Sequence, residues 1–200
     1  INDNGATSMF GSPALIDTLS RWGVENSVTL PSLRMVLSCG APARNDILQR
    51  FHRMLADECE IFTPYGATEA LPVSSIGSRM ILGETAPVTD AGGGTCVGMP
   101  IPKVKARIIK ISDEPITQWS EDLVVAAGEI GEITVTGPIV TREYYCRPES
   151  TMQAKIVDGS DVWHRMGDLG RIDEQGRIWF CGRKSHRVVG ENQTWFSIPC

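Results

Sequence analysis

Apolar residues recur at helical spacing twice in the first third of the chain. Ser12 and Pro13 suit the cap and the first turn of one helix, and Gly23 suits its end. The second helix is indicated by one apolar stripe, formed by Ile47, Leu48, Phe51, Met54 and Leu55. Short apolar runs at 33–37 and 60–62 lie on either side of this second helix and predict strands. The order strand, helix, strand predicts an α/β unit within residues 1–90.

Both predicted strands are followed by a short segment that can face a ligand. The first segment is Gly40-Ala41-Pro42, and the second is Tyr65-Gly66-Ala67-Thr68-Glu69. If the strands pair in parallel through a right-handed crossover, both segments leave the sheet at one edge. Ligands of open α/β sheets bind at that edge. The pattern therefore favours one shared crevice, although two unrelated turns fit it equally well.

From about Gly92 the helical period gives way to a two-residue period. Apolar and charged residues alternate over 103–109, which is typical of a half-buried strand. Residues 130–136 predict another strand, and 169–180 predict a hairpin around the turn at 173–176. Several short strands with glycine and proline turns favour a small barrel or sandwich. The predicted fold class is α/β followed by a small β-barrel over 91–182.

The segment 65–69 combines groups that suit a nucleoside triphosphate. It offers the flat ring of Tyr65, the hydroxyl of Thr68 for a phosphate, and the carboxylate of Glu69 for the divalent ion that phosphates carry. Asp168, which lies between glycines just before the predicted hairpin, can accept hydrogen bonds from the two hydroxyls of a ribose. Arg183 ends the far strand of that hairpin and can share the ribose or a phosphate. Taken singly, Asp168 also fits a turn residue and Arg183 a surface charge.

Composition narrows the class of partner. The net charge of −5 argues against binding to nucleic acid or to an acidic membrane surface. No apolar stretch approaches the ~20 residues of a membrane span, so an integral membrane protein is not expected. The six cysteines are far apart, without a Cys-x-x-Cys pair, which excludes the usual zinc spacings. Reduced thiols and a cytoplasmic location are expected.

Taken together, these motifs resemble one superfamily. The segments are Gly40–Pro42, Tyr65–Glu69, Gly128–Ile133 with Gly137-Pro138, His164–Asp168 and Gly182-Arg183. They occur in the order and spacing of the adenylate-forming enzymes, the AMP-dependent synthetases and ligases, and the resemblance covers nearly the whole chain. The strings PYGATEALPV, WHRMGDLG and WFCGRKSHRV most resemble the olefin β-lactone synthetase branch.

The resemblance implies ATP and Mg²⁺ as cofactors and a role for each motif residue. The residues implied to hold the nucleotide are Gly40, Ala41, Pro42, Tyr65, Gly66, Ala67, Thr68, Asp168 and Arg183. Thr68 is implied to bind a phosphate and Glu69 to hold magnesium, and both count as catalytic. Ser185 falls at the hinge between the large amino-terminal domain of the family and its small carboxy-terminal domain.

The implied reaction begins with attack of a carboxylate on ATP, which gives an acyl-adenylate and pyrophosphate. In the β-lactone branch, the 3-hydroxyl of a long-chain 3-hydroxy acid then attacks the activated carbonyl and expels AMP. A fatty acyl-CoA synthetase or acyl-AMP ligase is the alternative enzyme, and a nucleotide-binding module without catalysis is the non-enzyme alternative. Met166 stands where most members have threonine, which favours the β-lactone branch. Enzymes of a lipid or olefin pathway are the expected protein partners.

The ends of the sequence predict a piece of the large domain of a longer protein. The chain starts at Ile1 without methionine and stops at Cys200 within an apolar segment. Residues 183–200 are expected to form the hinge and the start of a following domain. The resemblance implies a phosphate loop before Ile1 and a catalytic lysine after Cys200. These 200 residues alone are therefore expected to be inactive.

Overall fold

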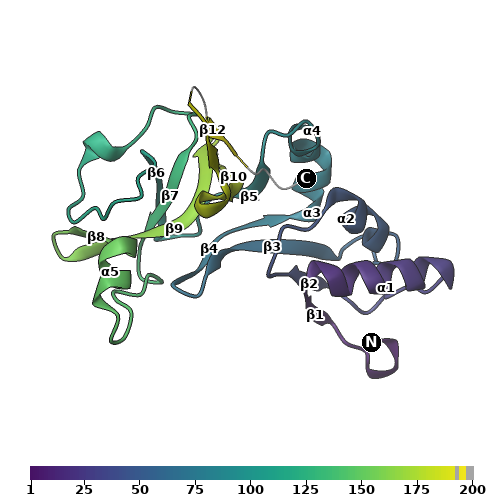
Figure 1. Ribbon diagram of the computed structural model, residues 1–200. Helices are drawn as coiled ribbons and strands as arrows, with labels where there is room; N and C mark the ends of the chain where they lie inside the picture. The colour runs from purple at the N-terminus through teal and green to yellow at the C-terminus, as the bar shows by residue number, and fades with distance from the viewer. Residues whose placement is uncertain (192–193, 197–200) are drawn as a thin grey trace.

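The computed structural model describes residues 1–191 and 194–196. Two sheets lie side by side, and two helices, α1 (Pro13–Glu25) and α2 (Asn45–His52), accompany the first of them (Figure 1). Of the predicted hinge segment 183–200, residues 192, 193 and 197–200 lie outside the described residues. Within the described ranges, no helix has both the length and the apolar character that a membrane span needs.

The first sheet has the strand order β1-β2-β3-β4. Its strands are β1 (Ser8–Gly11), β2 (Met35–Ser38), β3 (Glu60–Ala67) and β4 (Ala70–Gly77). The first three pair in parallel, and β4 runs antiparallel to β3. Because α1 joins β1 to β2 and α2 joins β2 to β3, the predicted α/β unit is confirmed.

The start of α1 agrees with the sequence, but its end does not. The Ser12 hydroxyl accepts a hydrogen bond from the Leu15 amide at 3.3 Å, and Pro13 occupies the first turn. The helix continues through Gly23 to Glu25. A Cβ on Gly23 would lie 2.0 Å from the terminal methyl carbon of Met54. Glycine at this position therefore makes room for Met54, and the prediction that it ends the helix is wrong.

Strand β3 is longer than the sequence pattern indicates. It extends through Tyr65 to Ala67, because β4 pairs with it from Phe62 to Ala67. The apolar run that forms β4 gave no prediction of its own. After β4 the chain turns into a helical segment made of α3 (Ser78–Met80), a π-helical turn (Ile81–Thr85) and α4 (Ala86–Asp90).

The second sheet has six strands, and its pairings are antiparallel. Its order is β5-β10-β9-β7-β6, and β8 pairs with the amino-terminal part of β9. The strands are β5 (Thr95–Gly98), β6 (Lys105–Ile109), β7 (Gly131–Thr136), β8 (Lys155–Asp158), β9 (Asp161–Ile172) and β10 (Ile178–Arg183). The predicted strands and hairpin are confirmed. The pairings form an open path from β5 to β6 within the described residues, so closure into a barrel stays a prediction.

Short elements complete the second half of the chain. They are η3 (Glu121–Leu123), α5 (Pro148–Ala154), η4 (Lys184–His186), β11 (Val188–Val189) and β12 (Thr194–Trp195), with η1 (Asn2–Asn4) at the other end of the chain. The first sheet ends with β4 at Gly77 and the second begins with β5 at Thr95, and the helical segment 78–90 lies between them. The division at 90 and 182 into separate domains itself stays a prediction.

The two sheets share part of their core. Buried side chains of α1, α2, β2 and β3 form one cluster, which includes Ile16, Phe51, Val36 and Ile61. Trp179, from β10 of the second sheet, belongs to this same cluster. The packing of Trp179 therefore fixes β10 against the first sheet and brings the carboxyl ends of β2 and β3 next to β9 and β10.

Candidate functional site

A cavity of about 1000 Å³ opens where these strand ends meet. Residues 40–42 after β2, residues 63–66 of β3, Asp168 of β9 and Arg183 of β10 all line it. Side chains of α2 and of the segment before β5 complete its wall. The structure thus brings Gly40, Tyr65, Asp168 and Arg183 into one crevice. For Gly40 and Tyr65 this follows from the parallel pairing of β2 and β3.

Asp168 is a buried carboxylate with one well-bonded oxygen. Its exposed fraction is 3%, and the Tyr65 hydroxyl donates a hydrogen bond to Oδ2 at 2.7 Å. The Arg183 Nη1 lies 2.8 Å from Oδ1 as an ion pair, but Oδ1 has no aligned hydrogen-bond donor. Burial raises the pKa of Asp168, while the Tyr65 hydrogen bond and the Arg183 charge oppose that rise. Oδ1 of this carboxylate is therefore buried at the cavity wall without an aligned donor.

The position of Asp168 differs from the one expected. Because β9 begins at Asp161, Asp168 lies within the first strand of the hairpin and not before it. Gly167 before it has a φ of +68°, and Gly182 on the facing strand has a φ of +111°, so both strands depart from regular pleating here. The register still pairs Arg183 with Asp168, as the hairpin predicts.

Tyr65 and the glycines of the motifs have structural reasons of their own. The ring centroid of Tyr65 lies 6.3 Å from that of Phe180 on β10. Burial and the Asp168 carboxylate raise the pKa of Tyr65 well above its ordinary value, so its hydroxyl stays a donor. A Cβ on Gly66 would lie 2.5 Å from the Ala70 carbonyl oxygen, and Gly40 has a φ of +98°. Gly66 is thus required by the close approach of β4, independently of any ligand.

The end of the 65–69 motif faces away from this cavity. Ala67 packs against the apolar cluster of the second sheet, Thr68 is exposed, and neither they nor Glu69 belong to the cavity lining. The Tyr144 hydroxyl donates a hydrogen bond to Glu69 Oε1 at 2.6 Å. That bond is the main reason why the pKa of Glu69 is lowered, so this carboxyl is ionised at neutral pH.

The donor set at Glu69 fits a nucleotide-bound magnesium ion better than a metal held by protein alone. No group of three or more histidine, cysteine, aspartate or glutamate side chains gathers in the described part of the chain. Magnesium is ordinarily held by one or two carboxylates together with phosphates and water. A single ionised Glu69 meets that requirement.

Lys155 and Tyr144, near Glu69, were not among the residues that the sequence indicated, and the motif residue His164 lies beside Lys155. Lys155 is 5% exposed. Its Nζ lies 3.2 Å from the Thr141 hydroxyl and 5.6 Å from the Tyr144 ring centroid. Burial lowers the pKa of Lys155 to about 8. His164 donates from Nδ1 to the Ala154 carbonyl at 3.2 Å, and burial lowers its pKa to about 4, which leaves it neutral. Only the pairing of β8 with β9 brings Lys155 beside His164.

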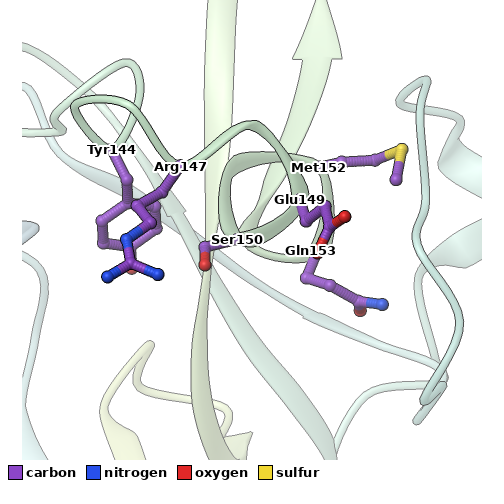
Figure 2. Close-up of a pocket in the computed structure, with 6 residues that line it drawn as sticks. All are labelled: Tyr144, Arg147, Glu149, Ser150, Met152 and Gln153. Carbon is purple, nitrogen blue, oxygen red and sulfur yellow. The ribbon is translucent and has the colours of Figure 1, made fainter.

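A second hollow, of about 790 Å³, lies over α5 and shares no lining residue with the larger cavity (Figure 2). Its lining residues are Tyr144, Arg147, Glu149, Ser150, Met152 and Gln153. Tyr144 therefore both lines this hollow and bonds Glu69. Ser185, the predicted hinge residue, is exposed in η4, between Arg183 and His186, which both line the larger cavity.

Comparison with known proteins gives the family of the chain. The family model of the AMP-binding enzymes matches residues 1–145, so the chain belongs to that adenylate-forming family. It is 48% identical to an olefin beta-lactone synthetase of Xanthomonas campestris pv. campestris over 92% of this chain and 33% of that protein. It is 47% identical to an olefin beta-lactone synthetase of Stenotrophomonas maltophilia, again over 92% of this chain and 33% of the relative.

Solved structures give the same fold. The amide bond synthetase McbA from Marinactinospora thermotolerans matches with a TM-score of 0.75 and 25% identity, over 98% of this chain and 35% of that one. The chain spans about a third of the length of the curated relatives it matches. It therefore aligns with one part of each of these relatives.

Proposed function

We propose that the whole protein activates a carboxylic acid with ATP, forming an acyl-adenylate and releasing pyrophosphate. The observation that carries this proposal is the Asp168 carboxylate, which is buried at the wall of the cavity with Oδ1 unoccupied by any aligned donor. A ribose presents two neighbouring hydroxyls, and a carboxylate beside a guanidinium is well suited to accept from both. Membership in the AMP-binding family supports the same reading.

The remaining motif residues take roles that follow from their places around the cavity. Gly40, Ala41 and Pro42 form one wall, which we assign to the adenine ring, and Tyr65 stacks on that ring. Gly66 and Ala67 keep the backbone of β3 close to the nucleotide. Arg183 shares the ribose with Asp168. Ser185 serves as the hinge to the part of the protein that follows.

Thr68 and Glu69 are assigned to the phosphates. The Thr68 hydroxyl is exposed and can donate to a phosphate oxygen, and the ionised Glu69 would hold the magnesium ion. Magnesium supplies neutralisation of the phosphate charge when it is bound. Tyr144 holds Glu69 in one orientation through its 2.6 Å hydrogen bond. Neither residue lines the larger cavity, so this assignment places the phosphates outside that lining.

For the second step we propose closure of a long-chain 3-hydroxy acid to a β-lactone. The 3-hydroxyl oxygen bonds to the activated carbonyl carbon and loses its proton, the bond from that carbon to the phosphate oxygen breaks, and AMP leaves. Attack within one molecule has a high effective concentration, which offsets part of the four-membered ring strain. The 48% identity to an olefin beta-lactone synthetase supports this step over thioester formation.

The test uses the full-length protein with a 3-hydroxy acid, ATP and Mg²⁺, with and without coenzyme A. A β-lactone and AMP formed without the thiol support the proposal, whereas a thioester formed only with the thiol replaces it with acyl-CoA ligation. ATP–pyrophosphate exchange driven by the acid separates an enzyme from a binding module without catalysis. Loss of exchange in Asp168→Ala is expected, and full exchange in that variant contradicts the assigned ribose site.

We also propose a cytoplasmic location and partner enzymes of a lipid or olefin pathway. The five cysteines of the described residues are free, which fits a reducing compartment. Cell fractionation followed by detection of the protein tests the location. Co-purification with an enzyme that makes 3-hydroxy acids, or with one that consumes β-lactones, tests the partnership.

A further inference from the structure

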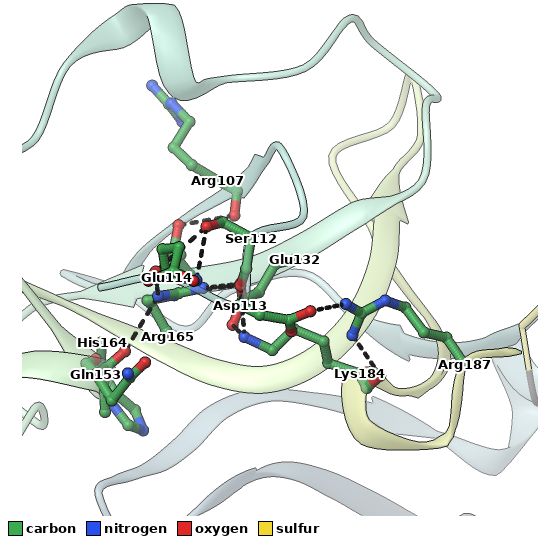
Figure 3. Close-up of polar contacts among 12 residues, drawn as sticks. Arg107, Ser112, Asp113, Glu114, Glu132, Gln153, His164, Arg165, Lys184 and Arg187 are labelled. Atoms are coloured by element: carbon green, nitrogen blue, oxygen red, sulfur yellow. Dashed lines mark hydrogen bonds and ion pairs between the residues drawn. The ribbon is translucent and has the colours of Figure 1, made fainter. Parts of the chain in front are cut away.

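A buried cluster of charges lies next to the cavity without lining it (Figure 3). Its centre is Glu132 of β7, which is 1% exposed. The Arg165 guanidinium donates to Glu132 Oε2 from Nη2 at 2.7 Å and from Nε at 3.2 Å. The Lys184 Nζ lies 3.1 Å from Glu132 Oε1. Burying one carboxylate and two cations is costly, so this cluster calls for a reason beyond stability.

On one side the cluster spans an irregularity in β9. Glu132 pairs with Leu169 and Thr134 pairs with Arg165, so residues 166–168 of β9 face the single residue 133 of β7. Asp168 lies in this bulged segment. The two hydrogen bonds between Arg165 and Glu132 join β9 on one side of the bulge to β7 on the other. They therefore fix how far the bulged segment projects.

On the other side the cluster holds β10. Phe180 pairs with Gly170 and Arg183 pairs with Asp168, so residues 181 and 182 face the single residue 169. Lys184 follows directly, and its Nζ binds Glu132 as well as the Ser112 carbonyl at 2.9 Å. One carboxylate is thus tied to both strands that carry the Asp168–Arg183 pair.

We propose that Glu132 is a positioning residue that sets the geometry with which Asp168 and Arg183 read the ribose hydroxyls. The inference rests on the proposed ribose role of Asp168. Removal of the negative charge leaves Arg165 and Lys184 as buried like charges, which separate and release both bulges. Arg165 keeps carbonyl partners in Glu114 at 2.9 Å and Gln153 at 3.2 Å, so its side chain stays anchored while its charged link across the bulge is weakened.

Discrimination between nucleotides measures this geometry directly. The full-length protein is titrated with ATP, 2′-deoxy-ATP and 3′-deoxy-ATP, and their dissociation constants are compared. Because each ribose hydroxyl bonds a charged group, the unaltered protein is expected to prefer ATP by roughly tenfold or more over each analogue. Glu132→Gln is expected to reduce that preference to less than about threefold, mainly through weaker ATP binding. If Glu132 had a purely structural role, the substitution would weaken the binding of all three nucleotides by the same factor.

Two other variants calibrate the result. Asp113→Asn removes the exposed partner of Arg187 near the same cluster and is expected to keep the full preference for ATP. Asp168→Asn is expected to abolish it. If Asp168→Asn keeps the preference, the proposed ribose site itself is wrong.

If Asp168→Asn abolishes the preference and Glu132→Gln retains it, only the inference about Glu132 is overturned. If the far-ultraviolet circular dichroism of Glu132→Gln shows that this variant does not fold, Lys184→Met is tested in its place. Lys184→Met removes one of the two links to Glu132 and leaves the pair of Glu132 with Arg165 intact. A folded Lys184→Met is expected to show a reduced preference for ATP. An unchanged preference in that variant overturns the inference.

Discussion

The hydrogen bond between Tyr65 and Asp168 gives the sharpest test of the site. In Tyr65→Phe the ring stays and only the hydroxyl is lost, together with its 2.7 Å bond to Asp168 Oδ2. Since Oδ1 has no aligned donor, this change leaves the buried carboxylate with the Arg183 ion pair alone. The fold should therefore lose stability although no apolar contact is removed.

The magnitude follows from the kind of bond. A hydrogen bond to a charged group contributes about 1.5–3 kcal/mol to stability. Asp168 is 3% exposed, so water does not replace the lost donor, and the upper half of that range is expected. Loss of the bond also raises the pKa of Asp168 further. The difference in unfolding free energy is therefore full at pH 8 and shrinks as the pH falls and Asp168 takes up a proton.

Urea unfolding of the full-length protein, followed at several pH values, measures both quantities. Tyr145→Phe is the matched control, because Tyr145 is 92% exposed and its hydroxyl should contribute less than about 0.5 kcal/mol. If Tyr65→Phe is as stable as Tyr145→Phe at pH 8, the buried hydrogen bond does not hold Asp168 and the reasoning about the site fails.

Three further predictions concern neighbouring groups. Tyr144→Phe removes the 2.6 Å bond to Glu69 and is expected to raise the Mg²⁺ concentration for half-maximal nucleotide binding roughly threefold to tenfold, as calorimetric titration can show. The pKa of Lys155 is lowered to about 8 from 10.5, so the folded state loses this proton first and stability should rise between those pH values. Lys155→Met should lack that rise in urea unfolding. Because burial raises the pKa of Asp168, ATP affinity should fall as the pH is lowered, beginning above the range of an ordinary aspartate. Asp168→Asn should bind weakly with no such dependence, and an identical pH profile in both proteins contradicts this assignment.

Local patterns predicted the elements whose cause is local. The Ser12 cap, the apolar stripe of α2 and the alternation along β6 each depend on residues within a few positions of one another, and each element is present. Gly23 shows where such a pattern stops being sufficient. Glycine is typical of a helix end, but the space that a side chain at this position would fill is occupied by Met54, which comes from a different part of the chain.

The partners within the site depend on pairings between distant strands. Lys155 and His164 come together only because β8 and β9 adopt one register, and Tyr144 reaches Glu69 across a large sequence separation. No residue near Glu132 in sequence indicates that Arg165 and Lys184 surround it. A one-residue slip in any of these registers would move the side chains to the opposite face of the sheet.

By itself the sequence determined which groups are available and along which strands they lie: a carboxylate at Asp168, a ring at Tyr65, a guanidinium at Arg183 and a glycine turn at Gly40. Periodicity and chain order also favoured a common edge for the ends of the strands before Gly40 and at Tyr65, although two unrelated turns fitted the pattern equally well. The tertiary structure decided how the groups are used. In it, the Tyr65 hydroxyl donates to Asp168, and Thr68 and Glu69 lie outside the cavity lining. Glu132 lies next to the irregularities of both β9 and β10. The physical reason is that hydrogen bonding and desolvation act over a few ångströms in space, whereas sequence patterns record only neighbours along the chain.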